Sequence, residues 1–111
     1  MHLTLQDFLK RAGGLRNCPF LLKGFGWVMQ GRVHEVQDFN GQIDLYCRGT
    51  SQRLFDDKDG PWQEMARDKC FTFRKRRAQS REWRGIVLLR FFNDNGTPVR
   101  IRIFPSMNDA A

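Results

Sequence analysis

Hydrophobic and polar residues alternate along much of the chain, with the period of two that is typical of β-strands. In residues 42–48, Ile43, Leu45 and Cys47 fall on one face, and polar residues fall on the other. Further alternating or apolar runs that predict strands cover residues 20–36, 53–55, 70–74, 84–92 and 97–104. The pattern therefore predicts a fold dominated by β-structure.

Turn-forming dipeptides separate these runs at short intervals. Asn40-Gly41, Asp59-Gly60 and Asn95-Gly96 each predict a turn, because Asn, Asp and Gly tolerate the positive φ that tight hairpins need. The run before Asn95-Gly96 is apolar on both faces except at Arg90, which indicates a central strand. Neighbouring strands are therefore expected to pair locally and antiparallel.

The first segment changes to a helical period. Thr4 is a good N-cap, and Leu5, Phe8 and Ala12 fall on one apolar stripe before Gly13-Gly14 ends the segment. A short amphipathic helix of this kind needs a sheet to pack against, because one narrow stripe does not stabilise it in water. One or two helical turns are also expected within residues 61–68, and a polar loop within residues 78–81.

Together these elements predict an α+β fold. One N-terminal helix would pack on a strongly bent, mostly antiparallel sheet or small β-barrel of five to six strands. The length of 111 residues suits a single domain, which we expect to cover residues 1–105, followed by a flexible tail at 106–111.

Composition limits the compartment and the cofactors. No apolar run is long enough to cross a bilayer, and the N-terminus lacks the pattern of a signal peptide, so a cytoplasmic protein with no membrane partner is expected. Cys18, Cys47 and Cys70 lie far apart and show no metal-ligand spacing. We therefore expect reduced thiols, with no metal and no cofactor.

Positive charge is concentrated in one short segment. The chain has a formal net charge of +7, but residues 1–68 hold equal numbers of basic and acidic residues. Residues 69–84 hold seven Lys or Arg and only one acidic residue, Glu82. Lys and Arg neutralise phosphates, and an aromatic residue between them can stack on unpaired bases. The candidate nucleic-acid-binding residues are Lys69, Arg74, Lys75, Arg76, Arg77, Arg81, Trp83 and Arg84, extended by Arg100 and Arg102.

The charge pattern favours non-catalytic binding of DNA or RNA, with single-stranded or structured nucleic acid preferred. No helix with basic residues on one face is visible, which argues against reading of duplex DNA by a helix. The alternative is a small interaction or inhibitor module that docks an acidic protein through the same residues. Association of the chain with itself through an uncovered strand is a related possibility.

Residues for catalysis are sparse. His2 lies near the chain end, and His34 lies alone within an apolar run, so neither has an identifiable nucleophile partner. The acidic cluster Asp56, Asp57 and Asp59 is typical of a solvated turn, and its spacing does not fit a calcium loop. The sequence therefore predicts no catalytic site.

The order of a capped helix followed by a bent antiparallel sheet resembles that of the Sm-like RNA-binding barrels. Residues 31–40 resemble their first motif, in which a glycine begins a strand and an Asp and an Asn lie in the following loop. Asp38 lies one residue further from Gly31 than in that motif, and Gly41 replaces an aliphatic residue. We assign no membership on this resemblance.

Overall fold

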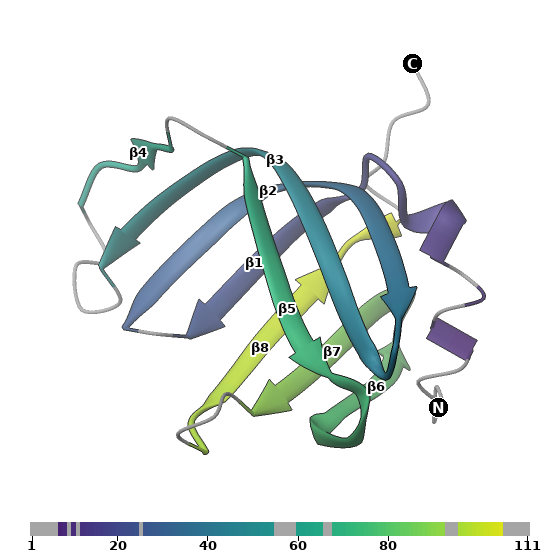
Figure 1. The fold of residues 1–111 in the computed structure, drawn as a ribbon. Helices are drawn as coiled ribbons and strands as arrows, with labels where there is room; N and C mark the ends of the chain where they lie inside the picture. The colour runs from purple at the N-terminus through teal and green to yellow at the C-terminus, as the bar shows by residue number, and fades with distance from the viewer. Residues whose placement is uncertain are drawn as a thin grey trace.

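The chain folds into one curled antiparallel sheet (Figure 1). The computed structural model describes residues 7, 8, 10, 12–24, 26–54, 60–65, 68–92 and 96–105. Within these residues, the strands are β1 (Pro19–Gly24), β2 (Trp27–Phe39), β3 (Gln42–Leu54), β4 (Gln63–Glu64), β5 (Lys69–Arg74), β6 (Ala78–Trp83), β7 (Ile86–Phe92) and β8 (Pro98–Ile103). Two short 3₁₀ helices are η1 (Ala12–Leu15) and η2 (Lys75–Arg77).

Nearly every strand pairs with its neighbour along the chain. The hydrogen-bonded order is β4-β3-β2-β1-β8-β7-β6, and β5 pairs with a different part of β3. β3 is long enough for both partners, since residues 42–47 pair with β5 and residues 51–52 pair with β4. Pairing of β8 with β1 joins the two ends of the chain within the sheet. The sheet is thus an open barrel, whose seam lies between β5 and β6.

The core fills the inside of this curl. Phe73 on β5 stacks on Phe91 on β7, with ring centroids 4.3 Å apart, so the two sides of the sheet meet across the interior. The side chains that face inward with them are almost fully buried: Phe20, Leu22, Val33, Ile43, Leu45, Cys47, Val87, Leu89, Val99, Ile101 and Ile103. The outward-facing side chains do not form this core, so candidate binding residues are sought among them.

The predicted α+β class is wrong, because the fold is nearly all antiparallel sheet and the described chain contains no helix of seven residues or more. Asp7, Phe8 and Lys10 are helical, Ala12–Leu15 form η1, and Thr4 and Leu5 lie outside the described residues. Phe8, which belongs to the predicted apolar stripe, nevertheless packs in the core, where its side chain is completely buried. Eight strands, rather than five to six, supply most of the structure of the described residues. This arrangement also departs from the expected helix-first barrel.

Two local predictions are also wrong. Gln63 and Glu64 form β4 where helical turns were expected, and residues 78–81 belong to β6 instead of a polar loop. Both segments have backbone partners in longer strands, which override their weak local preferences. The Asn40-Gly41 turn is confirmed between β2 and β3, with φ of 49° and 77°. The predicted tail and most of the Asp59-Gly60 and Asn95-Gly96 turns lie outside the described residues.

Candidate functional site

Five exposed cations cover the outer face of β1, β8, β7 and β6. Lys23, Arg100 and Arg90 form one row, because Lys23 lies opposite Arg100 and Arg100 lies opposite Arg90. Arg102 and Arg81 lie in the next row, on either side of Leu88. All five cations are exposed. We call this set, Lys23, Arg81, Arg90, Arg100 and Arg102, the cationic face.

The cationic face has no acidic counterpart on its own strands. The acidic residue of β6, Glu82, lies opposite the buried Val87 and shares its inward side. No other Asp or Glu occurs within the described residues of β1, β6, β7 and β8. Like charges directly opposite each other in a sheet reduce stability. The charges of Lys23, Arg100 and Arg90 are therefore expected to repel one another, and an anionic ligand would relieve this repulsion.

Aromatic rings lie on and beside the cationic face. The Trp83 side chain is 51% exposed at the end of β6, and the Arg84 guanidinium lies 4.8 Å from its ring centroid. Arg84 and Gly85 form the tight turn into β7, with φ of 49° and 79°. The Arg90 guanidinium lies 4.9 Å from the centroid of Phe92. Cations and open ring surface therefore occur together, as stacking on bases requires.

The residues predicted from the charge run are divided between two places. Arg81, Trp83, Arg84, Arg100 and Arg102 lie on or beside the cationic face. The others lie on β5 or at the corner between β5 and β6: Lys69, Arg74, Lys75, Arg76 and Arg77. The predicted set is therefore not one contiguous patch.

Acidic groups accompany the cations of the β5 side. At the corner, Lys75 Nζ lies 2.5 Å from Asp38 Oδ1, and its backbone N–H donates to the Gly41 carbonyl. On β5 itself, the Thr72 hydroxyl donates to Asp44 Oδ1 at 2.8 Å. On this side, Lys75 is therefore paired with an acid of the protein, and a second acid, Asp44, lies on the neighbouring strand.

The outer side of β2, β3 and β5 has a mixed charge as a result. Glu35 lies opposite Tyr46 in the β2–β3 register, and Tyr46 lies opposite Cys70 in the β3–β5 register. The pKa of Tyr46 is raised, first by the electrostatic effect of Cys70, then by burial and by Asp44. We call Glu35, Asp44, Tyr46, Thr72 and Arg74 the mixed face. It differs from the cationic face because acids and hydrogen-bond partners occur beside its cation.

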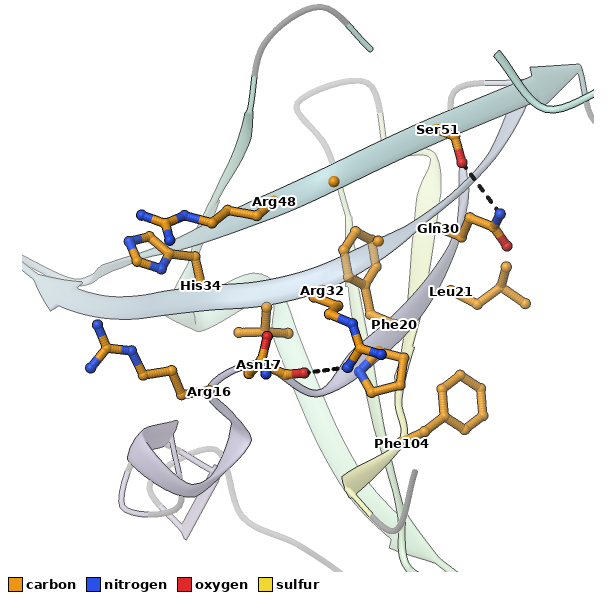
Figure 2. Close-up of a pocket in the computed structure, with 14 residues that line it drawn as sticks. Arg16, Asn17, Phe20, Leu21, Gln30, Arg32, His34, Arg48, Ser51 and Phe104 are labelled. Carbon is orange, nitrogen blue, oxygen red and sulfur yellow. Dashed lines mark hydrogen bonds between the residues drawn. The ribbon is translucent and has the colours of Figure 1, made fainter. Parts of the chain in front are cut away.

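A hollow of about 860 Å³ lies on the outer side of β1 and β2, next to the segment that follows η1 (Figure 2). Its charged lining consists of Arg16, Arg32 and Arg48, and His34 lies with them. Apolar side chains also line it, among them Leu21 and Phe104. Figure 2 shows Arg16, His34 and Arg48 toward one end of the hollow, and Leu21 and Phe104 toward the other. We call this hollow the arginine groove.

Local backbone features shape the arginine groove. The β2–β3 register shifts between Gln30 and Arg32 and again between Val33 and Glu35, as a β-bulge does. Gly31 lies at the first shift, and a Cβ there would approach the Arg48 carbonyl oxygen to 2.8 Å, so only glycine fits without movement. The bulge therefore depends on that glycine.

Hydrogen bonds attach the segment after η1 to β2. The Asn17 N–H donates to the Val33 carbonyl at 2.6 Å, and the Val33 N–H donates to the Cys18 carbonyl at 2.9 Å. Arg32 Nη1 donates to the Asn17 carbonyl at 2.8 Å, which holds this guanidinium at the groove. Arg32 is thus fixed in place, whereas Arg48 is 4.0 Å from Asp68 in an exposed ion pair.

Reasoning from the linear charge run missed Lys23 and Arg90 of the cationic face, as well as the cations of the groove. Their partners in space are distant along the chain, so no local run marks them. The alternation did carry a signal, since Leu22 and Leu89 point inward and their chain neighbours Lys23 and Arg90 must point outward. Listing outward positions strand by strand would have found both residues.

The thiols and other candidate ligands form no further centre within the described residues. Cys18 and Cys47 are buried and Cys70 is exposed, and none of the three forms a disulfide. Burial, followed by the charges of Cys70 and Asp68, raises the pKa of Cys47 to about 12. No group of three His, Cys, Asp or Glu side chains in the described part of the chain could hold a metal ion. Over the same residues, no helix is long and apolar enough to span a membrane.

Comparison with known proteins finds no matching family, no similar curated protein and no similar solved structure.

Proposed function

We propose that this protein binds nucleic acid without catalysis, through the cationic face, and that it prefers single strands. The observation that carries the proposal is the row of Lys23, Arg100 and Arg90, directly opposite one another and without an acid on their strands. Adjacent strands are ~4.8 Å apart, so these three charges span ~10 Å of open sheet. A polyanion crossing the strands would meet all three charges and release its counterions.

Two features support a single strand over a duplex. Trp83 offers a half-exposed ring at the margin of the cationic face, and unpaired bases stack on such rings. The described residues contain no helix long enough to enter a major groove. Stacking also favours nucleic acid over an acidic protein, which presents carboxylates but no row of bases. The free thiols suit the reducing cytoplasm that we propose as its location.

The test is a fluorescence anisotropy titration with labelled oligothymidine, carried out over a series of salt concentrations. We expect binding at about 50 mM salt, with log affinity falling by about 0.7 per log unit of salt for each phosphate engaged. Absence of binding at that salt concentration contradicts the proposal.

Direct binding of polyglutamate in the same buffer tests the acidic-protein alternative. A Trp83→Ala variant should lose about fivefold or more in affinity for oligothymidine, since a stacked base contributes ~1–3 kcal/mol. Its affinity for polyglutamate should stay unchanged, because a carboxylate chain does not stack. Tighter binding of polyglutamate than of oligothymidine, with no effect of Trp83→Ala on either, favours an acidic protein partner.

A further inference from the structure

We propose that the arginine groove binds a terminal phosphate carried by a nucleoside. The source is the 5′-phosphate end of a strand that lies on the cationic face, or a free mononucleotide. The first source rests on the proposed function, and the second does not. The ligand is thus defined by its chemistry: a phosphate monoester with a flat base attached.

The phosphate assignment follows from the charges of the lining. Arg16, Arg32 and Arg48 come from three separate segments, and no Asp or Glu lines the groove. Asp68 lies 4.0 Å from Arg48, in an exposed ion pair outside the lining. A phosphate monoester carries up to two negative charges and accepts paired hydrogen bonds from guanidinium groups. Arg16 and Arg48 lie with His34 toward one end of the groove, where the phosphate would bind (Figure 2). The Arg32 guanidinium, which donates to the Asn17 carbonyl, lies nearer the Phe104 side. A single carboxylate would neutralise only part of this charge.

The nucleoside assignment follows from the other end of the groove. Leu21 and Phe104 provide apolar surface for a base. Gln30 and Ser51 line the groove as well, and the Gln30 amide donates to the Ser51 hydroxyl at 3.3 Å, so polar groups are available to a base edge. The volume of about 860 Å³ lies within the usual range of small-ligand sites.

The position of the groove connects it to the cationic face. Leu21, which lines the groove, lies directly opposite Arg102 in the β1–β8 register. A strand whose first phosphate lies in the groove can therefore continue over Arg102 onto β8 and β7. This continuity gives the groove a use in recognising strand ends.

The test compares oligothymidine with and without a 5′-phosphate, labelled at the 3′ end, by anisotropy. We expect the phosphorylated strand to bind about tenfold more tightly, as charged hydrogen bonds to one phosphate allow. In the double variant Arg16→Gln, Arg48→Gln, the ratio of the affinities for the phosphorylated and the unphosphorylated strand should be close to one. The double variant should still bind the unphosphorylated strand. The matched control Arg74→Gln, Arg76→Gln removes the same charge elsewhere and should keep the ratio.

Calorimetry with thymidine 5′-monophosphate and with thymidine tests the free-nucleotide source. Binding of the monophosphate alone, lost in the double variant, supports the groove even if no oligonucleotide binds and the proposed function fails. A ratio near one in the wild type together with no binding of the monophosphate overturns the inference and leaves the proposed function intact. Persistence of the ratio in the double variant also overturns it, because the phosphate would then bind elsewhere.

Discussion

The cationic face and the mixed face belong to one continuous sheet, yet their charged residues are arranged differently. On the mixed face, Asp44 accepts a hydrogen bond from Thr72, and Glu35 and Asp44 lie near Tyr46. On the cationic face, Lys23, Arg100 and Arg90 face one another directly. Acids and a cation occur together in the first region, whereas the second region carries cations with no acid on the outer side of their own strands, all of which the structure describes. Function is therefore expected where the protein leaves its own charges unmatched.

The largest change in stability should follow from a substitution in the core beneath the cationic face. Ile101 is 1% exposed on the inner side of β8, between the outward-facing Arg100 and Arg102. Ile101→Ala should lower the free energy of unfolding by about 2–4 kcal/mol, because it leaves a cavity in the core. Arg102→Gln should change it by less than ~0.5 kcal/mol. Urea denaturation measures both variants, and a comparable loss for Arg102→Gln would assign that arginine a structural role.

The next effect concerns the β3 side, where burial and nearby charge raise the pKa of Cys47 from 9.0 to about 12. Above pH 9 the unfolded chain releases the thiol proton while the folded protein retains it. Stability from this group is therefore complete below pH 9 and falls as the pH rises toward 12, by at most ~1.4 kcal/mol per pH unit.

Urea denaturation of the wild type and of Cys47→Ala between pH 8 and pH 11 measures this dependence. The difference in stability between the two proteins should narrow as the pH rises, because only the wild type carries the thiol. Cys70→Ser, at the exposed cysteine, serves as the control and should follow the wild type more closely. Parallel curves for the wild type and Cys47→Ala would show that the buried thiol does not couple to folding.

The smallest expected effect is an increase in stability, whereas the two changes above decrease it. Arg100 lies between Lys23 and Arg90, so Arg100→Gln should raise the free energy of unfolding by about 0.2–1 kcal/mol at low salt. The gain should shrink as salt screens the repulsion. Arg74→Gln on the mixed face should bring no such gain, because Arg74 lies opposite Gln42. A loss of stability in Arg100→Gln would mean that a counter-charge already compensates this row.

Much of the sheet could be predicted from alternation alone. The inward sets of residues 42–48 and 97–104 were correct, since Ile43, Leu45 and Ile101 are buried. The Asn40-Gly41 hairpin was correct because its chemistry is local. The strand at residues 78–83 was missed because its polar residues gain their partners only from β7. The prediction of an α+β class is wrong because an apolar stripe around Phe8 is compatible with short helical turns as well as with a full helix.

The candidate site was only half visible in the sequence. The charge run includes Arg81 and Arg84, which lie on or beside the cationic face, and the phase of the last strand predicts that Arg100 and Arg102 point outward, as they do in the structure. The run could not reveal that Lys75 has Asp38 beside it, since the two residues meet only through the β2–β3 turn and η2. It also could not bring Lys23 and Arg90 together on either side of Arg100, because that requires the pairing of β1 with β8.

The most direct test compares two variants that each remove three cations. One is Lys23→Gln, Arg90→Gln, Arg100→Gln on the cationic face, and the other is Arg74→Gln, Lys75→Gln, Arg76→Gln on β5 and its corner. Affinity for oligothymidine is measured by anisotropy across salt concentrations. The first variant should lose roughly tenfold or more at about 50 mM salt, and its salt slope should become shallower by about 2, with the second variant near the wild type. Equal losses, or a larger loss in the second variant, would contradict the assignment of binding to the cationic face.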